Sequence, residues 1–204
     1  MIRDYALRTF SRQLGAPSGF LGTLVARRLN KGNLPAIRAA VDALALQGGE
    51  TVADIGFGGG VGLRLLLDEV GPTGHVHGVD PSADMVARAR RVYGTQVELH
   101  RAPMEALPVA DGALDGWISL NTIYFIRDLA PALAELARTL AAAGTGVLGI
   151  GDPEWMAALP VTRHNFTLRP VPDVVAALES AGLAVETQTL SRGPASYHLL
   201  VCRH

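Results

Sequence analysis

The sequence of 204 residues holds a single cysteine, Cys202, and few aromatic residues. One cysteine cannot form an internal disulfide framework, and it suits a reducing compartment. Phe, Trp and Tyr together make up only 5% of the chain, so the sequence does not indicate a binding site walled by stacked rings. The formal net charge of −1 at pH 7 gives no overall attraction toward nucleic acid or anionic membranes.

The chain also lacks a long hydrophobic run. Its stretches without a charged residue are short: Gln13–Ala26 has 14 residues and Thr139–Gly151 has 13. A transmembrane helix needs about 20. Charged residues at Arg3, Asp4, Arg8 and Arg12 interrupt the apolar core that a signal peptide requires. We therefore expect a cytoplasmic protein with no membrane insertion and no nucleic-acid partner.

What the sequence does contain is the composition of a globular protein. Hydrophobic residues make up 49% and charged residues 18%, and the length suits one domain with a core of its own. Apolar residues at helical spacing precede Gly48, and the pair Gly48-Gly49 predicts a helix stop. We expect residues 1–47 to form a helical cover and residues 48–204 to form the main structural unit.

The first 31 residues are rich in basic side chains. Asp4 is their one acidic residue, against six basic ones: Arg3, Arg8, Arg12, Arg27, Arg28 and Lys31. Two interpretations stay open. The segment is either a solvated helix face or a lid that closes over a site and favours anionic or polar substrates.

From Thr51 onward, short apolar runs alternate with helical patterns. Strands are predicted at 51–55, 74–79, 96–100, 113–120 and 144–151, and helices at 61–70, 82–93 and 128–140. Such alternation with short turns predicts an α/β fold with a parallel sheet covered on both faces. The end differs, because a predicted helix at 172–182 precedes strands at 183–190 and 196–202. Two strands so close in sequence form an antiparallel hairpin.

A glycine cluster lies between the first predicted strand and helix, in the stretch "TVADIGFGGGVG". A glycine-rich turn there lets a ligand lie against bare backbone near a helix N-terminus. The dinucleotide fingerprint G-x-G-x-x-G is not met, because its third glycine would fall on Val61 or Leu63. Present instead is an acidic residue followed by glycines at every second position: Asp54, Gly56, Gly58 and Gly60. A tight turn needed for helix packing alone is the other interpretation.

The second predicted strand ends on Asp80, in "HGVDPS". A carboxylate at that position can accept hydrogen bonds from both hydroxyls of a ribose. Asp80 could also cap the helix that begins near Ser82. Its occurrence together with the glycine turn favours a riboside ligand, although Asp80 by itself does not distinguish NAD from other ribosides.

Four longer stretches carry a resemblance to a known family. "VADIGFGGG", "GVDPSADMVARAR", "APMEALPVADGALD" and "NTIYFIRDLAPALAELARTL" resemble successive motifs of class I S-adenosylmethionine-dependent methyltransferases, over about Leu44 to Val201. The upstream "GAPSGFLGTLVARRLNKGN" is similar to the helical lead-in of one small bacterial subgroup. The resemblance implies a Rossmann-like, doubly wound sheet of seven strands, mostly parallel, with a C-terminal antiparallel hairpin. It also implies S-adenosyl-L-methionine as cofactor and S-adenosyl-L-homocysteine as product.

The resemblance further implies which residues hold the cofactor. Residues matching Asp54, Gly56, Gly58 and Gly60 line its methionine part, Asp80 holds the ribose with Pro81 beside it, and Met85 lies near the adenine. The family's Asp-Ala-Glu after the third strand is replaced by Pro103, Met104 and Glu105. The usual side-chain acceptor for the adenine amino group is then missing, so backbone groups and apolar contacts, also from Leu107, would replace it. Asn121, after the fourth strand, completes the set.

The acceptor is expected above the cofactor sulfur, near the loops after the fourth and fifth strands. Candidates there are Asn121, Tyr124, Asp152, Glu154 and His164. His164 has the most suitable intrinsic pKa for a general base, and Tyr124 is the second catalytic candidate. No metal is required by the spacing of these residues. His75 and His77 share a strand face that points away from the site.

Methyl transfer is an in-line displacement on an activated donor, so alignment and exclusion of water can suffice. From this we expect transfer to a small molecule, more readily at oxygen, with a sugar or other aliphatic hydroxyl as a mild preference. Two alternatives stay open: an NAD(P)-dependent oxidoreductase and a binding module that holds S-adenosylmethionine without catalysis. A homodimer is also left open.

Overall fold

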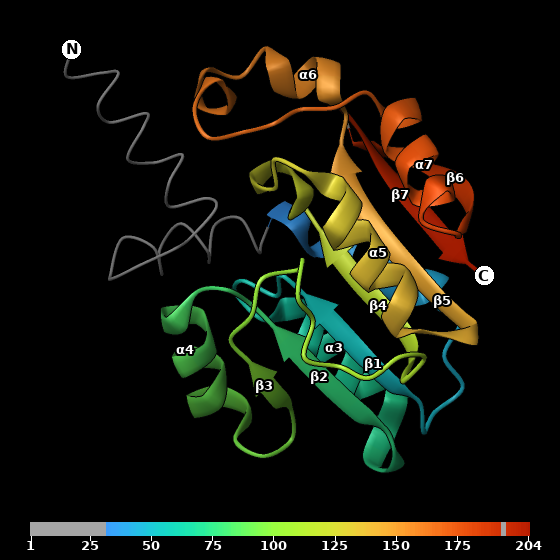
Figure 1. Cartoon of the computed structure of the whole chain (residues 1–204). Helices are drawn as coiled ribbons and strands as arrows, with labels where there is room; N and C mark the ends of the chain where they lie inside the picture. The colour runs from blue at the N-terminus through green and yellow to red at the C-terminus, as the bar shows by residue number, and fades with distance from the viewer. Residues whose placement is uncertain (1–31, 193–194) are drawn as a thin grey trace.

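The computed structural model describes residues 32–192 and 195–204, and only the backbone of Arg192. Its centre is a seven-stranded sheet with the strand order β3-β2-β1-β4-β5-β7-β6 (Figure 1). The strands are β1 Thr51–Ile55, β2 His75–Val79, β3 Glu98–His100, β4 Leu114–Leu120, β5 Leu140–Gly151, β6 Ala184–Arg192 and β7 Ala195–Arg203. The predicted seven-stranded α/β fold is thereby confirmed.

Helices cover both faces of this sheet. They are α3 Val61–Val70, α4 Ala83–Tyr93, α5 Leu129–Thr139, α6 Pro153–Ala157 and α7 Val171–Ser180, with short 3-10 helices η1 Gly71–Thr73, η2 Ile123–Phe125 and η3 Pro160–Arg163. In Figure 1, α5 and α7 lie in front of the sheet and α3 lies behind it. None of the described helices is long and apolar enough to cross a bilayer.

Two hydrophobic cores follow from the alternation of side chains along the strands. On β1, Ala53 and Ile55 face the core shared with α5 and α7, whereas Val52 faces the core shared with α3 and α4. On β4, Trp117 and Ile118 divide in the same way, and both are fully buried. Burial on both faces is why these strands read as nearly continuous apolar runs in the sequence.

Residues 32–43 form one more helix, and it belongs to the same structural unit. Ala36, Ala40, Val41 and Leu44 are buried in the core with α3 and α4. The division of the chain that we expect between residues 47 and 48 stays a prediction. The basic segment and its lid interpretation fall on residues 1–31, outside the described residues.

The C-terminal hairpin pairs β6 with β7 in antiparallel register, from Ala184 opposite Arg203 to Arg192 opposite Ala195. β7 also pairs antiparallel with β5, so it is inserted between β5 and β6. The other neighbouring strands are parallel. The hairpin predicted from sequence is confirmed.

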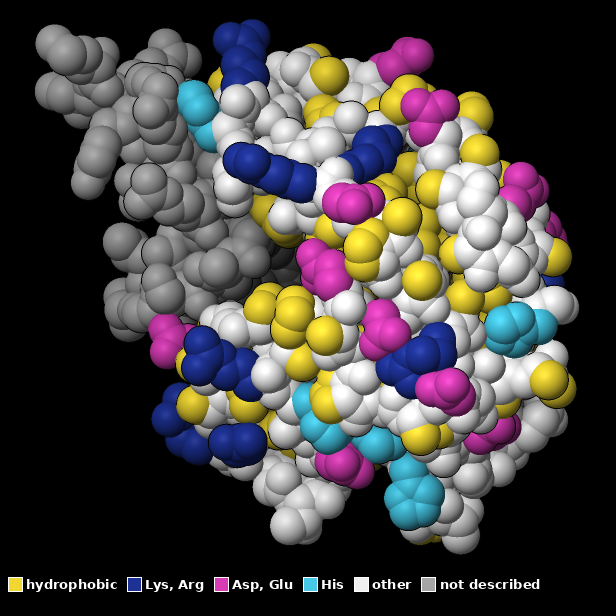
Figure 2. Space-filling model, in the orientation of Figure 1, with side chains coloured by type: hydrophobic (Ala, Val, Ile, Leu, Met, Phe, Trp, Pro, Cys, Tyr) yellow, Lys and Arg dark blue, Asp and Glu magenta, His cyan; other side chains and the backbone are white. Residues whose placement is uncertain are grey.

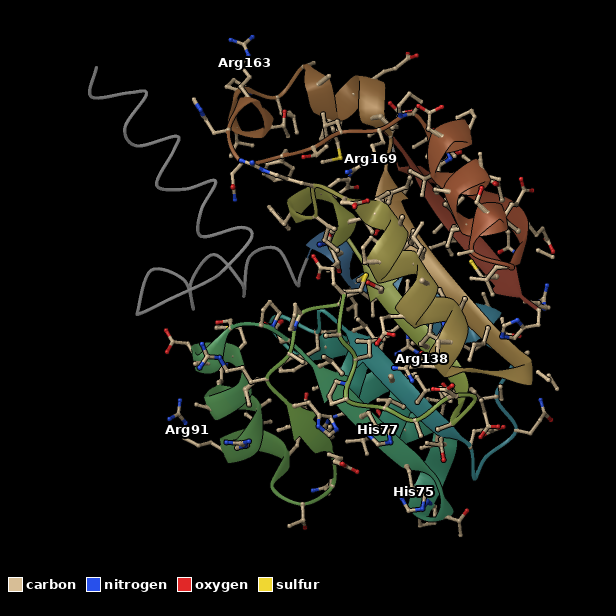
Figure 3. The ribbon with its side chains drawn as sticks, in the orientation of Figure 1. His75, His77, Arg91, Arg138, Arg163 and Arg169 are labelled. Carbon is tan, nitrogen blue, oxygen red and sulfur yellow. The ribbon has the colours of Figure 1, made fainter. Side chains whose placement is uncertain are left out.

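The connection from β3 to β4 contains no helix within its described residues, 101–113. Two side chains of α5 hold it in place. The Arg138 guanidinium donates to the carbonyl oxygens of Val109 and Leu107 at 2.8 and 3.1 Å, and Glu135 accepts from the Leu107 N–H at 2.8 Å. Figure 3 shows Arg138 under this connection. The connection thus has a fixed path from the carboxyl end of β3 to the start of β4.

Candidate cofactor and acceptor site

A cavity of about 350 Å³ opens at the carboxyl ends of the central strands. Five segments line it: the end of β1 with the glycine loop, Val79–Pro81 after β2, Ala102–Glu105 after β3, the segment after β4, and the helix at 32–43. The chain leaves β1 toward β2 and β3, but leaves β4 toward β5 on the other side. Open α/β sheets bind their ligands at this point of divergence.

The glycine loop between β1 and α3 presents backbone to the cavity. Its glycines at 56, 58 and 60 share positive φ angles of 78°, 49° and 79°, which other residues rarely adopt. A Cβ at Gly56 would lie 2.6 Å from the side chain of Thr122. A Cβ at Gly62 would overlap the carboxylate of Asp54. The loop therefore needs glycine both for its path and for close packing, and Gly56, Gly58 and Gly59 line the cavity.

Asp80 joins the end of β2 to the glycine loop. Its Oδ2 accepts a hydrogen bond from the Gly58 N–H and its Oδ1 accepts one from the Ser82 N–H, both at 2.8 Å. Burial raises the pKa of Asp80, while these two hydrogen bonds act to lower it. The carboxylate is only 6% exposed and lines the cavity. Its remaining lone pairs are available to hydroxyl groups of a ligand.

Asp54, at the end of β1, is the second buried carboxyl group of the cavity. Burial and, to a smaller extent, the charge of Asp80 raise the pKa of Asp54 to about 8. A positive charge that a ligand brings beside Asp54 would stabilise the ionised form of its carboxyl group. The two carboxyl groups therefore suit a ligand that carries both hydroxyl groups and a cationic centre.

Comparisons with known proteins agree with this arrangement. A family model described as a methyltransferase domain matches residues 52–144. A S-adenosylmethionine-dependent methyltransferase from Aquifex aeolicus superposes with a TM-score of 0.73 at 20% identity, covering 89% of this chain and 98% of that one. The chain contains a class I S-adenosylmethionine-dependent methyltransferase domain.

Two curated relatives match this methyltransferase domain over part of their length. An arsenite methyltransferase from Halobacterium salinarum is 40% identical over 79 residues, which are 37% of this chain and 20% of that protein. A demethylmenaquinone methyltransferase from Thermus thermophilus is 36% identical over 110 residues, 52% of this chain and 50% of that protein. The chain thus spans between a fifth and a half of the length of these two relatives.

The residues that sequence reasoning assigned to the cofactor divide into two groups. Those that line the cavity of the methyltransferase domain are Asp54, Gly56, Gly58, Asp80, Pro81, Pro103, Met104, Glu105 and Asn121. Gly60 and Met85 do not line it. Gly60 packs against Tyr93, whose hydroxyl donates to the Gly60 carbonyl at 2.6 Å, and Met85 is 2% exposed within the core beside α3. Met85 thus faces the core from α4, and its expected place near the adenine stays a prediction.

The segment after β4 forms the wall opposite the glycine loop. Asn121 has a φ of 59°, a left-handed conformation that asparagine tolerates, and its N–H donates to the Gly149 carbonyl at 2.8 Å. Thr122 lies against Gly56, and its hydroxyl is 3.1 Å from Ser119 Oγ. Thr122, Phe125 and Ile126 line the cavity, but sequence reasoning did not select them because no local pattern marks them.

Tyr124, a predicted catalytic residue, does not line this cavity. It is 5% exposed, and its hydroxyl oxygen accepts a hydrogen bond from the Gly151 N–H at 2.6 Å. Burial raises the pKa of Tyr124 well above the ordinary range. Its ring packs near Phe125 and Phe166, with centroids 6.4 and 5.7 Å away. In this arrangement Tyr124 joins the ends of β4 and β5, and its catalytic role stays a prediction.

His164, the predicted general base, follows η3 and also lies outside the lining of the cavity. Asp152 and Glu154 are outside it as well. Asp152 caps α6 by accepting from the Trp155 N–H at 2.7 Å, and its other oxygen lies 3.6 Å from His198 Nε2. The chain between β5 and α7, which holds these residues, does not line the cavity that Asp54 and Asp80 line, and the role predicted for His164 stays a prediction.

One arginine that sequence reasoning missed holds this part of the site together. Arg169 donates to the carbonyl oxygens of Ile126 and Arg127 at 2.8 and 2.7 Å, and to those of Ile123 and Thr167 at 3.3 Å. Figure 3 labels Arg169 beside the segment after β4. Its position after a run of irregular structure gives no sequence signal, since all four contacts are to backbone.

Proposed function

We propose that the protein transfers the methyl group of S-adenosylmethionine to an oxygen atom of a small molecule. One observation carries the proposal: two buried carboxyl groups, Asp54 and Asp80, flank a glycine loop at the carboxyl ends of β1 and β2. S-Adenosylmethionine has a ribose with two neighbouring hydroxyl groups and a cationic methionine portion. The carboxyl groups match these two features.

Asp80 would hold the ribose. The hydrogen bonds from Gly58 and Ser82 fix the plane of its carboxylate before any ligand arrives, so little ordering is left to do on binding. Asp54 and the bare backbone of Gly56 and Gly58 would hold the methionine part, with Asn121 opposite them. When bound, the cofactor supplies an activated methyl group.

The adenine would lie against the connection after β3. Pro103 and Met104 line the cavity there, and Met104 is 4% exposed. Arg138 and Glu135 fix the continuation of this connection. The apolar lining and the backbone groups of this segment would take the place of the missing acidic side chain.

The acceptor would enter between the helix at 32–43 and the segment after β4. Asn33 and Ile37 line the cavity from the helix, and Phe125 and Ile126 line it from the other side. This is a recess of small size with mixed polar and apolar walls, which supports a small-molecule acceptor. The curated relatives act, by their names, on arsenite and on demethylmenaquinone, so membership in the family leaves the acceptor open.

Among oxygen acceptors, the site favours a hydroxyl that ionises readily. The titratable groups of the described lining are Asp54, Asp80 and Glu105, and the first two serve the cofactor. An ordinary aliphatic hydroxyl would need a general base worth roughly 10²–10⁴-fold. His164 is the histidine on the loop after β5 that could fill this role if that loop closes on the acceptor.

A turnover assay tests the proposal. Methyl transfer should be measured with a panel of phenols, carboxylic acids, enols and sugars, together with amine and thiol acceptors. We expect an acidic hydroxyl to be methylated, and His164→Ala and Tyr124→Phe to retain most of kcat. A loss of at least about tenfold in kcat for His164→Ala, with an inflection near the imidazole pKa of about 6.5, would assign a base to His164 and a sugar-like hydroxyl to the site.

The two alternatives give other results in the same experiments. A nicotinamide-dependent oxidoreductase would bind NADH or NADPH in calorimetric titrations, and S-adenosylhomocysteine would not compete. A non-catalytic module would bind S-adenosylmethionine but show no turnover with any acceptor. Methylation of amine or thiol acceptors alone would contradict the assignment to oxygen.

A further inference from the structure

A cluster of potential metal ligands lies on β2 and β3, outside the cofactor cavity. His77 of β2 is directly opposite Glu98 of β3 in the parallel register, and His100 is two residues further along β3. Residues two apart on a strand share a face, so all three side chains project from the same side of the sheet. Figure 2 shows a group of histidine side chains at the surface near the lower edge of the molecule, and Figure 3 labels His77 on β2.

The atoms of this cluster are close, but they are spaced too widely for good hydrogen bonds. His77 Nδ1 lies 3.4 Å from His100 Nε2, Glu98 Oε1 lies 3.3 Å from His100 Nε2, and Glu98 Oε2 lies 3.7 Å from His77 Nδ1. Hydrogen bonds between such groups centre near about 2.9 Å. The imidazole rings are nearly parallel, at 19°, with centroids 5.6 Å apart.

These spacings match the edges of a coordination tetrahedron. With zinc–nitrogen bonds of about 2.0–2.1 Å, two tetrahedral ligand atoms are about 3.3–3.4 Å apart. Two imidazole nitrogens and a carboxylate oxygen are also a ligand set that suits zinc and similar ions, whereas magnesium and calcium prefer oxygen ligands throughout. Among the described residues, no other three His, Cys, Asp or Glu side chains come together in this way.

The cluster is accessible to an ion from solution. The side chains of His77 and His100 are 16% and 19% exposed, and that of Glu98 is 67% exposed. An ion held by the two imidazoles would therefore keep its remaining coordination positions on the solvent side. We propose that His77, Glu98 and His100 bind one divalent transition-metal ion, of which zinc is the best fit.

Such an ion would cross-link the edge strand β3 to its neighbour β2. β3 has only three residues, and its pairing with β2 rests on three register positions. Ligands from both strands would add a cross-link where backbone pairing is shortest. His100 also directly precedes the connection whose residues Ala102–Glu105 line the cofactor cavity. The ion would therefore stabilise the base of that wall without taking part in methyl transfer.

Calorimetric titration of the full chain with zinc tests the proposal. The protein should carry no polyhistidine tag and should first be stripped with a chelator and dialysed. We expect one zinc ion per chain, no binding of magnesium, and a rise in the melting temperature with zinc, because the ion binds the native state. Replacing zinc with Co²⁺ should give the d–d absorption of a tetrahedral site.

Three variants and one control decide whether these residues are the ligands. His77→Gln, Glu98→Gln and His100→Gln should each weaken zinc binding by at least about tenfold, since even residues that only orient ligands change affinity that much. His75→Gln is the matched control, because His75 lies on the same strand and face but outside the cluster. It should bind zinc like the wild type.

Circular dichroism of the metal-free proteins would show whether the variants fold. Glu98 is exposed, so Glu98→Gln keeps the test valid if a histidine variant does not fold. The proposal is overturned if the wild type binds no stoichiometric zinc, if Glu98→Gln binds as tightly as the wild type, or if His75→Gln loses as much affinity as the ligand variants.

Discussion

At the residue scale, the two carboxyl groups of the cavity have different tasks and different environments. Asp80 is held by two backbone N–H groups, whereas Asp54 is enclosed between β1 and the start of α3, beside Gly62. Burial dominates the electrostatics of both. Burial therefore disfavours the charged form of each carboxyl group in the free protein, and a cationic ligand beside it would favour that form.

The first prediction concerns Asp80. Asp80→Ala removes the acceptor for two ribose hydroxyls and should weaken binding of S-adenosylhomocysteine by roughly 1.5–3 kcal/mol, the range of charge-assisted hydrogen bonds. Calorimetric titration measures this. Asp84→Ala, which changes an exposed acidic residue in the first turn of α4, is the control. An affinity equal to that of the wild type would remove Asp80 from the site.

The second prediction concerns Asp54 and pH. Its pKa is raised in the folded state from an ordinary value near 4 to about 8, so folding takes up a proton between these values. Below about pH 4, Asp54 is protonated in both states and its ionisation does not reduce the free energy of unfolding. As pH rises from about 4 toward 8, the free energy of unfolding falls, because the unfolded state ionises this group more readily than the folded state. The melting temperature of the free wild type should therefore fall over this interval.

Asp54→Asn imitates the protonated carboxyl group and should flatten this dependence. At pH 8 it should be more stable than the wild type by at least about 1 kcal/mol, or about 2–4 °C in melting temperature for a chain of this size. It should also bind the cofactor more weakly, because it cannot ionise beside the cationic methionine part. Thermal melts at pH 5 and pH 8 test this, and an unchanged pH dependence would contradict it.

At the scale of elements, the site is made where the ends of β1, β2 and β4 meet the connection after β3. The glycine loop is the element on which this junction depends, because its positive φ angles let the Gly58 N–H reach Asp80. Tyr124 and Arg169 act on the opposite wall, by hydrogen bonds to backbone from the ends of β4 and the chain before α7. The position of each wall is therefore fixed by contacts outside the cavity.

The third prediction separates ligand binding from backbone strain in this loop. Gly58→Val puts a branched side chain at a φ of 49°, and no atom lies within 3.4 Å of its Cβ position. The bulk would enter the cavity, so binding of S-adenosylhomocysteine should be lost while circular dichroism stays close to that of the wild type. Calorimetry measures the binding.

Gly71→Val is the matched control. Gly71 also has a positive φ, 68°, and open space at its Cβ position, but it lies outside the cavity. Full cofactor affinity is expected there. Persistence of binding in Gly58→Val would mean that the glycines serve the path of the turn alone.

At the scale of the whole molecule, one sheet carries two separate functional edges. The carboxyl ends of the central strands form the cofactor cavity, and the face of β2 and β3 carries the proposed metal site. At the other end of the sheet, β7 pairs with both β5 and β6. Residues of β7 pack in the same hydrophobic core as residues of α5 and α7. A ligand in the cavity would therefore contact the central strands of a single sheet, and its binding should stabilise the whole sheet against unfolding.

The fourth prediction follows from this continuity. A ligand that binds only the native state at 100 times its Kd stabilises it by about 2.7 kcal/mol. For a chain of this length, the melting temperature should rise by roughly 5–10 °C with S-adenosylhomocysteine. NADH at the same concentration should give no shift, and a shift with NADH alone would favour the oxidoreductase.

The sequence by itself determined the order of elements, the terminal hairpin and the pairing of Asp54 with Asp80 around a glycine turn. These depend on short-range patterns: the period of apolar residues, caps such as Ser82, and the end of each strand. Only the tertiary structure decided which side chains share a cavity. It turned Met85 into the core, engaged Tyr124 with Gly151, and brought His77 beside Glu98 and His100. Strand register and loop paths set these distances, and both arise from contacts between residues far apart in the chain, which no local pattern encodes.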